Sequence, residues 1–227
     1  MKKLFTYIVL PLAIIGLAYL VYSSINKPVK FDKERDVRKA VAIQQLKDIR
    51  DIEVAYKSVY NKFTADVDSL KDFYLNGKMK VLLQIGSQDD SAAVSHTEAI
   101  KKKNRKITNE ELFKLYQNGD KKLVFTIESE VPTRSEILQD RTDFDVNSIG
   151  IIPFSGGDKV LMDAVIKTVS GVQVPLFEAK MPYNSLLKGM DEQLIINLNA
   201  EMTDTDRYPG LMVGSVENPN NNAGNWE

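Results

Sequence analysis

The chain has 227 residues, 43% of them hydrophobic and 27% charged, which is enough to bury one good core or two small ones. Its 30 basic and 31 acidic side chains leave a net charge of -1, and this balance argues against nucleic-acid binding, which needs a basic surface. The sequence contains no cysteine, which excludes disulfides, thiolate metal sites, cysteine nucleophiles and a lipid-modified N-terminal cysteine.

An uncharged apolar run of 19 residues, from Leu4 to Tyr22, lies near the N-terminus. As a helix it extends about 28 Å, close to the roughly 30 Å hydrocarbon thickness of a bilayer, so we predict a transmembrane helix over residues 4–22. A cleaved signal peptide is the alternative, with Lys2 and Lys3 as its positively charged start. Bulky side chains at 19–22, where a cleavage site needs small ones, favour a retained anchor in the lipid bilayer.

The flanks of this run set the expected topology. The two lysines before it favour a short cytoplasmic N-terminus at residues 1–3, whereas cations after it have the opposite effect: Lys27, Lys30, Lys33 and Arg35. Residues 23–32, "SSINKPVKFD", read as an extended linker that contains Pro28. We expect a single-pass protein of the cytoplasmic (inner) membrane whose residues 23–227 lie outside the cytoplasm.

A helical stem is predicted over residues 33–63. Its apolar residues recur at intervals of three and four and form one stripe along a helix: Ala42, Leu46, Ile49, Ile52, Tyr56, Val59 and Phe63. Such a stripe usually faces the core of its own domain, and we favour this reading for residues 56–63. A helix of this length also extends beyond a small domain, so residues 42–52 are equally consistent with a surface that contacts a partner protein or a second copy of the chain.

A break follows the stem, and the short segment "DVDSLKDF" then precedes the first predicted strand. The first 77 residues or so resemble the front half of type IV pilins and pseudopilins. The resemblance lies in the order of three segments: an apolar segment, an amphipathic stem ending in "AYKSVYNKF", and this short segment. The resemblance implies a membrane-anchored subunit whose N-terminal helix packs into a filament or an assembly platform. The family's processing motif, with a glycine before the apolar helix and a glutamate within it, has no counterpart here.

The next part of the chain alternates strand and helix signals. Strands are expected at 78–86 and 121–130. Residues 87–106 between them read as a solvated helix or a mobile excursion. This segment ends in the basic cluster Lys101–Lys106, for which an anionic membrane surface is a conceivable partner although such runs are usually solvated.

Two further helices are predicted. Thr108 and Glu111 have capping-box spacing at the start of one helix, and Asn118-Gly119 marks its end. The second helix is expected over 185–202 with an uncertain end, and a short strand follows at 210–216.

Three consecutive apolar runs, at 149–154, 159–168 and 172–181, suggest an antiparallel meander. The segment "SGGD" reads as the hairpin turn between the first two, and Pro175 indicates an edge position for the third. The expected fold class is α+β. An N-terminal transmembrane helix continues through a linker into a long amphipathic helix that packs on a small antiparallel sheet, within an extracytoplasmic domain over residues 33–217.

Residue types found in catalytic and metal sites occur, but no complete motif joins them. Asp143, Asp145 and Asn147 have the 1-3-5 spacing of a calcium loop, yet a serine replaces the sharp-turn glycine and the closing glutamate is missing. "SGGDK" lacks the spaced glycine cradle of a phosphate loop. His96 is the only histidine and lies in a polar segment. We therefore expect no catalytic residue, no cofactor, no metal site and no enzyme activity.

Residues 218–227 form an Asn- and Gly-rich tail whose composition favours disorder, yet this tail carries the only tryptophan, Trp226. One interpretation is an exposed tail in which that side chain has no role. The other is that Trp226 docks into a groove on this domain or on a partner. The segments "YPGL", "VGS" and "NAGNWE" also resemble the ends of single-pass envelope proteins, a resemblance that implies no activity.

Three functions are consistent with these features. The favoured one is a non-enzymatic structural or assembly protein of the cell envelope, pilin-like or secretion-like, that acts through protein contacts of its helical stem. The hypothetical interaction residues are Ala42, Leu46, Ile49, Ile52, Tyr56 and Trp226. The second is a membrane-tethered extracytoplasmic module that binds a ligand in a groove beside the meander. The third, an anchored hydrolase, lacks any motif.

Overall fold

The computed structural model describes Tyr7 and residues 9–227 of the chain. The predicted cytoplasmic N-terminus at 1–3 lies outside this range, as do residues 4–6 and 8 of the predicted span. The fold class is α+β, as predicted, because a long N-terminal helix is followed by small antiparallel sheets and short helices.

The described chain divides into two compact units, whereas the sequence indicated one domain over residues 33–217. The first unit contains the chain up to Lys71 together with Asp143–Glu227, and the second contains Asp72–Thr142. The second is separate because it buries apolar side chains of its own strands and helices in a core of its own.

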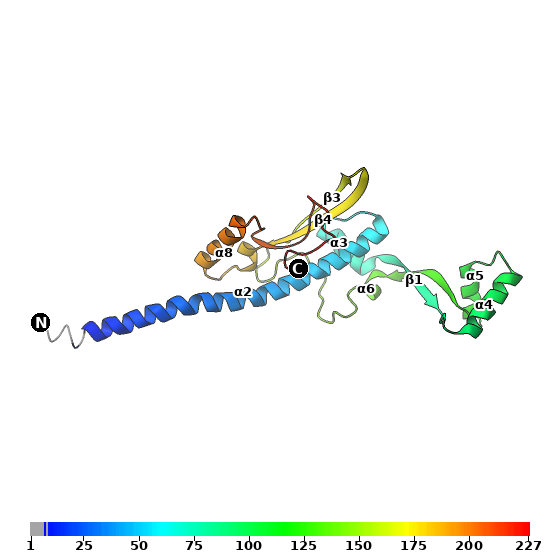
Figure 1. Ribbon diagram of the computed structural model, residues 1–227, viewed down its shortest axis with the longest axis horizontal. Helices are drawn as coiled ribbons and strands as arrows, with labels where there is room; N and C mark the ends of the chain where they lie inside the picture. The colour runs from blue at the N-terminus through cyan, green and yellow to red at the C-terminus, as the bar shows by residue number, and fades with distance from the viewer. Residues whose placement is uncertain (1–6, 8) are drawn as a thin grey trace. The chain divides into compact units, whose positions relative to one another are not determined.

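Helix α2 (Leu10–Tyr60) runs without a break for 51 residues, or about 77 Å (Figure 1). It ends at Asn61, whose left-handed backbone (φ 56°) directs its N–H to the carbonyl of Lys57. The extended linker predicted at 23–32 is not observed, since these residues are helical and Pro28 lies inside the helix. One proline removes one backbone hydrogen bond, and helix already formed on either side propagates through it.

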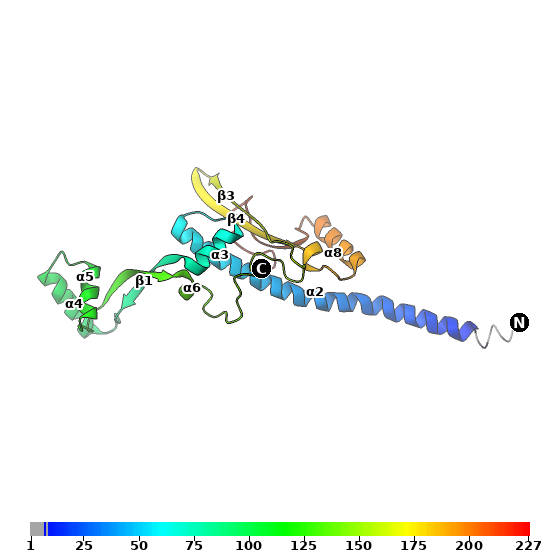
Figure 2. The same cartoon turned by 180° about the vertical axis from the view of Figure 1, so that it is seen from behind.

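The sheet of the first unit is antiparallel and has the order β3-β4-β5, with β3 at Leu161–Val169, β4 at Val172–Pro182 and β5 at Gly210–Gly214. Helix α2 runs along this sheet and contacts β4 and β5 (Figures 1 and 2). The core of the unit is built from fully buried side chains of the helix and the two strands: Leu46, Ile49, Ile52, Phe177, Ala179, Met181, Leu211 and Val213.

The prediction that Pro175 makes its strand an edge strand is wrong, because β4 lies between β3 and β5. The reason is the short length of β5, which pairs only with Glu178–Pro182 of β4. Pro175 precedes this stretch and lies opposite Ile166 of β3, so β4 has a single neighbour at that position. The missing N–H of a proline is tolerated there for the same reason as in an edge strand.

The segment 149–154, expected to be the first strand of the meander, forms only an isolated bridge between Ile151 and Lys159. A turn at "SGGD" joins the two sides of this bridge, as predicted. The Ser155 hydroxyl holds the turn, since Oγ donates to the Ile152 carbonyl at 2.7 Å and accepts from the N–H of Asp158 at 2.9 Å. The meander instead consists of β3, β4 and β5.

The helix predicted at 185–202 is two helices, α7 (Tyr183–Leu186) and α8 (Glu192–Asp204). Gly189 interrupts them with a positive φ of 83°. Asp191 then starts α8 by accepting a hydrogen bond from the N–H of Leu194 at 3.2 Å. In the first unit α7 packs beside α2 and the sheet.

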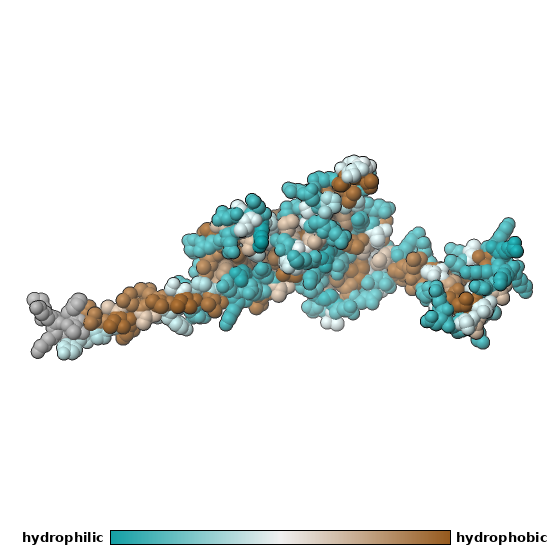
Figure 3. All heavy atoms as spheres, in the orientation of Figure 1, coloured by the Kyte–Doolittle hydropathy of each residue, from teal (hydrophilic) through white to brown (hydrophobic). Residues whose placement is uncertain are grey.

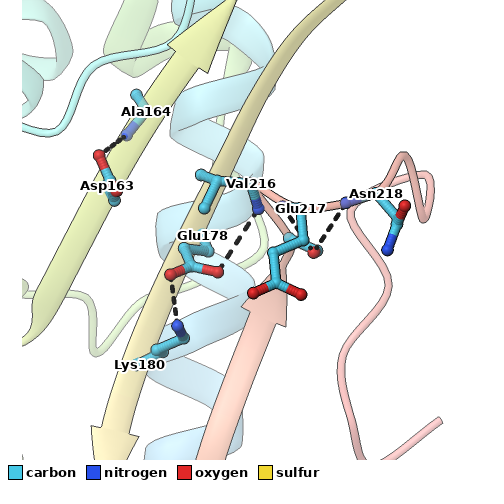
Figure 4. A network of polar contacts seen from close by, with 8 residues as sticks. Asp163, Ala164, Glu178, Lys180, Val216, Glu217 and Asn218 are labelled. Atoms are coloured by element: carbon cyan, nitrogen blue, oxygen red, sulfur yellow. Dashed lines mark hydrogen bonds and ion pairs between the residues drawn. The ribbon is translucent and has the colours of Figure 1, made fainter. Parts of the chain in front are cut away.

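Glu178 is a buried acidic residue on β4, and its polar partners fix the chain where it leaves β5 (Figure 4). Its carboxylate accepts hydrogen bonds from the ammonium of Lys180 and from the N–H of Val216 at 3.4 Å. Gly214 ends β5 with φ 73°, and a Cβ there would lie 2.2 Å from the carbonyl oxygen of Phe177. Only glycine therefore lets the C-terminal segment turn back at this point.

The chain passes into the second unit within α3 (Val67–Asn76). This unit contains an antiparallel two-stranded sheet and three helices: β1 (Lys78–Ile85), α4 (Ser91–Lys103), α5 (Asn109–Gln117), β2 (Phe125–Pro132) and α6 (Thr133–Glu136). The core that joins α5 to the sheet consists of Leu112, Leu123, Phe125 and Ile127.

Local capping signals account for both long helices of the second unit. The capping box of Thr108 and Glu111 is present as predicted. Asp90 caps α4 by accepting hydrogen bonds from the N–H groups of Ala92 and Ala93, both at 3.1 Å. Of the two interpretations of residues 87–106, a solvated helix is therefore the correct one for Ser91–Lys103.

Candidate functional site

The first part of α2 exposes a continuous series of large apolar side chains, which Figure 3 shows as a brown stretch of the helix. From Leu10 to Tyr22 none of the large apolar residues is buried. The helix is long and apolar enough to cross a membrane, although length and composition alone are weak evidence for a span. Exposed apolar surface of this extent is unfavourable in water, so a lipid or protein environment must cover it.

The predicted interaction stripe lies in the core of the first unit. Ala42, Leu46, Ile49 and Ile52 are all 0% exposed. Of the two readings of residues 42–52, the structure therefore supports the core reading, and a partner cannot contact these side chains while the unit is folded. Tyr56 is half-buried, and its ring lies 4.5 Å from that of Tyr60. Periodicity could not distinguish the two readings because it shows that a stripe is apolar but not what covers it.

A different face of α2 is open. It carries four exposed aliphatic side chains: Val37, Ala40, Val41 and Val54. Ala40 and Val54 point away from the buried stripe, and Val41 lies at its margin. Val37 is 59% exposed and Val41 is 45% exposed. We call Val37, Ala40 and Val41 the open stem face.

Long polar side chains attach α2 rigidly to the loops around it. Arg38 donates to the carbonyl oxygens of Leu186 and Lys188 at 3.3 and 3.0 Å. Gln45 Nε2 lies 2.8 to 2.9 Å from the carbonyl oxygens of Ser148, Ile149 and Ile151. Their partners lie more than 100 residues further along the chain, so no local sequence pattern could have identified these contacts.

Glu53 is a buried acid within this helix. Its side chain is 0% exposed; Oε2 accepts a hydrogen bond from the N–H of Thr64 at 3.2 Å, and Oε1 has no hydrogen-bond partner. Burial removes water from the carboxylate and raises the pKa of Glu53 to about 8. Glu53 is therefore mostly protonated at neutral pH, which avoids an unpaired buried charge.

The C-terminal tail is ordered along the edge of β5, where its composition had indicated disorder. The N–H of Gly214 donates to the Ala223 carbonyl at 3.0 Å. Asn225 makes three further bonds: its N–H donates to the Met212 carbonyl, its Oδ1 accepts from the Met212 N–H, and its Nδ2 donates to the Gly210 carbonyl. Backbone hydrogen bonds of this kind depend on the position of β5, so the amino-acid composition of the tail does not predict them.

Trp226 lies at the end of this docked tail. Its ring covers Gly224 so closely that a Cβ there would be 2.3 Å from the ring. Its Nε1 is buried and has no hydrogen-bond partner. The ring also borders a hollow of about 410 Å³ together with Lys39, Tyr208 and Arg207. Glu227 follows and forms an ion pair with Arg50 of α2 at 2.8 Å.

A larger hollow of about 600 Å³ lies beside the start of β3. Its wall includes Asp66, Lys71 and Lys159 together with Gly150 and Gly157. Asp66 accepts hydrogen bonds from the hydroxyl and from the N–H of Ser69, and these bonds, the hydroxyl's first, lower the pKa of Asp66. The hollow is a polar, open groove next to the meander.

The residues considered for metal or catalytic chemistry have structural roles. Asp145 accepts hydrogen bonds from the N–H and Nδ2 of Asn147, which makes a local turn rather than an open ligand set. His96 Nε2 lies 2.8 Å from Asp120 on the surface of the second unit, and this hydrogen bond lowers the pKa of Asp120. Within the part of the chain that the structure describes, no three or more His, Asp or Glu side chains gather as metal ligands.

Comparisons of the chain with protein-family models, with curated proteins and with solved structures give no match. The layout of a long apolar helix followed by a small α+β region is loosely consistent with that of pilins, but no relative supports membership of that family. Function is therefore inferred from the geometry of this chain.

Proposed function

We propose that this protein is a single-pass, membrane-anchored structural or assembly protein of the cell envelope, which acts through protein contacts and not through chemistry. One observation carries the proposal: the apolar segment and the core helix of the first unit are the same unbroken helix, α2. An enzyme that only needs to be kept near a membrane requires no such stiffness, because a flexible tether is sufficient. A subunit that transmits a fixed orientation does require it.

The contacts at the base of the helix support a rigid connection. Phe31 is already buried in the first unit, only nine residues, or about 14 Å, beyond Tyr22. Arg38 and Gln45 then fasten the helix to α7 and to the 148–151 loop. A tilt or rotation of the membrane helix is therefore passed directly to the folded unit.

The open stem face is the proposed contact surface, in place of the buried stripe. Val37 and Val41 are one helical turn apart and remain exposed on the part of α2 that runs along the folded unit. The resemblance to pilins implies lateral packing of N-terminal helices. The aliphatic side chains of the open stem face would extend such packing beyond the bilayer. The partner is a neighbouring helix of the same or another envelope protein.

The proposed topology places the helix in the cytoplasmic membrane, with both folded units outside the cytoplasm. Single-cysteine variants test this because the natural chain has no cysteine. A cysteine at exposed Asn104 should react with a membrane-impermeant maleimide in intact cells, whereas one at Leu46 should react only after unfolding. Labelling of Asn104→Cys only after lysis of the cells would place the units in the cytoplasm and contradict the proposal.

Cross-linking tests the contact surface. Cysteines at Val37 and Val41 should form cross-links with a neighbouring protein in native membranes, and a cysteine at Lys57, on another side of the helix, should not. Equal, negligible cross-linking at all three positions would show that the stem stands alone, and assembly through it would be excluded.

The groove beside β3 supports a second candidate function, a membrane-tethered binding module. Its volume of about 600 Å³ is in the range of small-molecule sites. Leu161 lines the groove and is 55% exposed, so substituting it by tryptophan would separate the two candidates. Under the assembly proposal Leu161→Trp leaves stem cross-linking and cellular function intact, whereas loss of cellular function with intact cross-linking favours the binding module.

A further inference from the structure

Within the described chain, neither outer edge of the two-stranded sheet of the second unit has a further strand, and helices α5 and α6 contact β2. Strand β1 pairs with β2 over eight residues, from Lys78 opposite Pro132 to Ile85 opposite Phe125. In the described chain no other strand joins β1, so every second N–H and carbonyl along it faces away from the sheet. Two-stranded sheets are marginal in water, and a third strand stabilises them.

Leu82 is the most exposed apolar side chain of β1. It is 71% exposed in the middle of β1, on the face that also carries Lys80 and Gln84. Across the sheet its neighbour is Glu128, so no apolar side chain of β2 lies directly opposite it. Exposed apolar strand edges are avoided in monomers because they invite pairing with another strand, and the charged residues of β1, Lys78 and Lys80, lie only at its start.

The sequence of β1 is complementary to itself about Leu82. If a second β1 runs antiparallel with Leu82 opposite the other copy's Leu82, Lys80 faces Gln84, Val81 faces Leu83 and Met79 faces Ile85. On one face every pair is apolar, and on the other the two leucines meet at the centre without like charges facing each other. Shifting this register by one residue would put apolar residues opposite polar ones.

We infer that β1 is a self-association edge, which pairs with β1 of a second copy about a two-fold axis at Leu82 to form a continuous four-stranded sheet, β2-β1-β1-β2. The contact is isologous, so each copy contributes the same residues. Pairing buries both Leu82 side chains and satisfies the outward backbone groups of both strands.

The same register extends the core of the second unit. Ile85 packs against the cluster of Leu112, Leu123, Phe125 and Ile127, and it would lie directly opposite Met79 of the second copy. Met79 and Val81 are only partly buried within one chain. The second copy therefore covers the part of the apolar face that lies beyond this core.

This inference rests on the proposed function in one respect, that an assembly protein must have a partner. The partner inferred here is a second copy of the chain, and the contact surface is β1, which is distinct from the stem. The two can fail separately. A membrane protein cross-linked through Val41 but not through β1 would disprove this inference alone. A β1-linked dimer recovered as a cytoplasmic protein would disprove the proposed function alone.

Cysteine trapping tests the register directly, in the full-length protein in native membranes. The natural chain has no cysteine, so Leu82→Cys can form a disulfide only with another molecule. At the two-fold axis the two Cα atoms are about 4.5 to 5.5 Å apart, within the range of a disulfide. Mild oxidation should convert most Leu82→Cys chains to a covalent dimer.

Two matched controls distinguish disulfides formed between paired β1 strands from disulfides formed by random collision of two chains. Lys80→Cys is equally exposed, but four residues of stagger separate it from its counterpart by about 14 Å. Glu128→Cys is separated from its counterpart by three strand spacings, also about 14 Å. Neither should cross-link alone, whereas a mixture of Lys80→Cys and Gln84→Cys chains should give the mixed dimer.

A charge variant gives an independent readout. Leu82→Lys puts two ammonium groups opposite each other at the axis but lies beside Glu128 within its own sheet, so the unit stays folded. Detergent-solubilised wild type should have the mass of two chains, and Leu82→Lys should have the mass of one while melting at an unchanged temperature. Absence of the Leu82→Cys dimer, or equal cross-linking of Leu82→Cys and Lys80→Cys, would overturn the inference.

Discussion

Glu53 couples the stability of the first unit to pH. The carboxyl is fully buried in α2, accepts one hydrogen bond from the N–H of Thr64, and burial raises its pKa from 4.5 to about 8. Between these two values the unfolded chain releases this proton and the folded chain keeps it. Stability contributed by Glu53 is therefore full below about pH 4.5 and is lost progressively as the pH rises to about 8.

We predict that Glu53→Gln removes this dependence. The pKa difference corresponds to a loss on the order of 4 to 5 kcal/mol across the window. The variant should be more stable than the wild type at pH 8 and similar to it at pH 5, because glutamine has the same shape but no charge. Urea unfolding at both pH values measures this, and parallel pH curves for the two proteins would contradict it.

Asn225 holds the C-terminal tail against β5. Its side chain accepts from the Met212 N–H at 3.1 Å and donates to the Gly210 carbonyl at 2.9 Å. We predict that Asn225→Ala lowers the free energy of unfolding by about 1 to 2 kcal/mol. It should also move the fluorescence of Trp226, the only tryptophan, towards that of a solvated indole.

Asn218 provides the matched control for this prediction. It is an exposed asparagine of the same tail, and its hydrogen bond to Ser215 uses its backbone N–H and not its side chain. Asn218→Ala should therefore leave both the unfolding free energy and the fluorescence unchanged. If the two variants behave alike, the tail is not held in the described position.

At the scale of elements, the buried stripe of α2 is the core of the first unit. We predict that Ile49→Ala costs about 2 to 5 kcal/mol, because Ile49 is 0% exposed and its removal leaves a cavity. Val54→Ala on the open side of the same helix should change stability by less than about 0.5 kcal/mol. Thermal unfolding of both variants distinguishes the core from a partner surface, and a folded, fully stable Ile49→Ala would restore the latter.

The continuity of α2 predicts a fixed distance across the region where the sequence indicated a linker. Spin labels on cysteines at the exposed positions Ile25 and Val41 are sixteen residues, or about 24 Å of helix, apart. We expect one narrow distance distribution near this value in detergent and in bilayers. A broad distribution would show an extended, flexible connection around Pro28 and would remove the main support for rigid coupling.

Local signals were sufficient to predict several elements. Thr108 and Glu111 satisfy each other within four residues, so the start of α5 follows from sequence alone. The strand expected at 78–86 likewise corresponds to β1 (Lys78–Ile85). Each of these features is determined by neighbours in the chain.

The features that were missed depend on distant residues. Pro28 suggested a linker because the buried Phe31 that follows it gave no local sign of packing. The tail suggested disorder because its hydrogen bonds reach back to Gly210 and Met212. The stripe from Ala42 to Ile52 was recognised, but only the position of β4 and β5 shows that it is covered.

At the scale of the whole molecule, one chain combines an exposed apolar helix segment with two folded units. The first unit is built around the helix that carries the apolar segment, and in the second unit the outer edge of β1 has no strand partner within the described chain. The proposed anchoring and orientation both depend on α2, whereas the proposed self-association depends on β1, so single substitutions can test them separately.

The most direct measurement is the intact mass of the protein in each fraction of the cell after alkaline washing of the membranes. Permanent anchoring predicts the full mass of 25.6 kDa in the washed membrane fraction. A soluble species that lacks the residues up to about Tyr22 would contradict it, because the apolar segment would then be a removed signal and α2 would be only the core helix of a secreted protein.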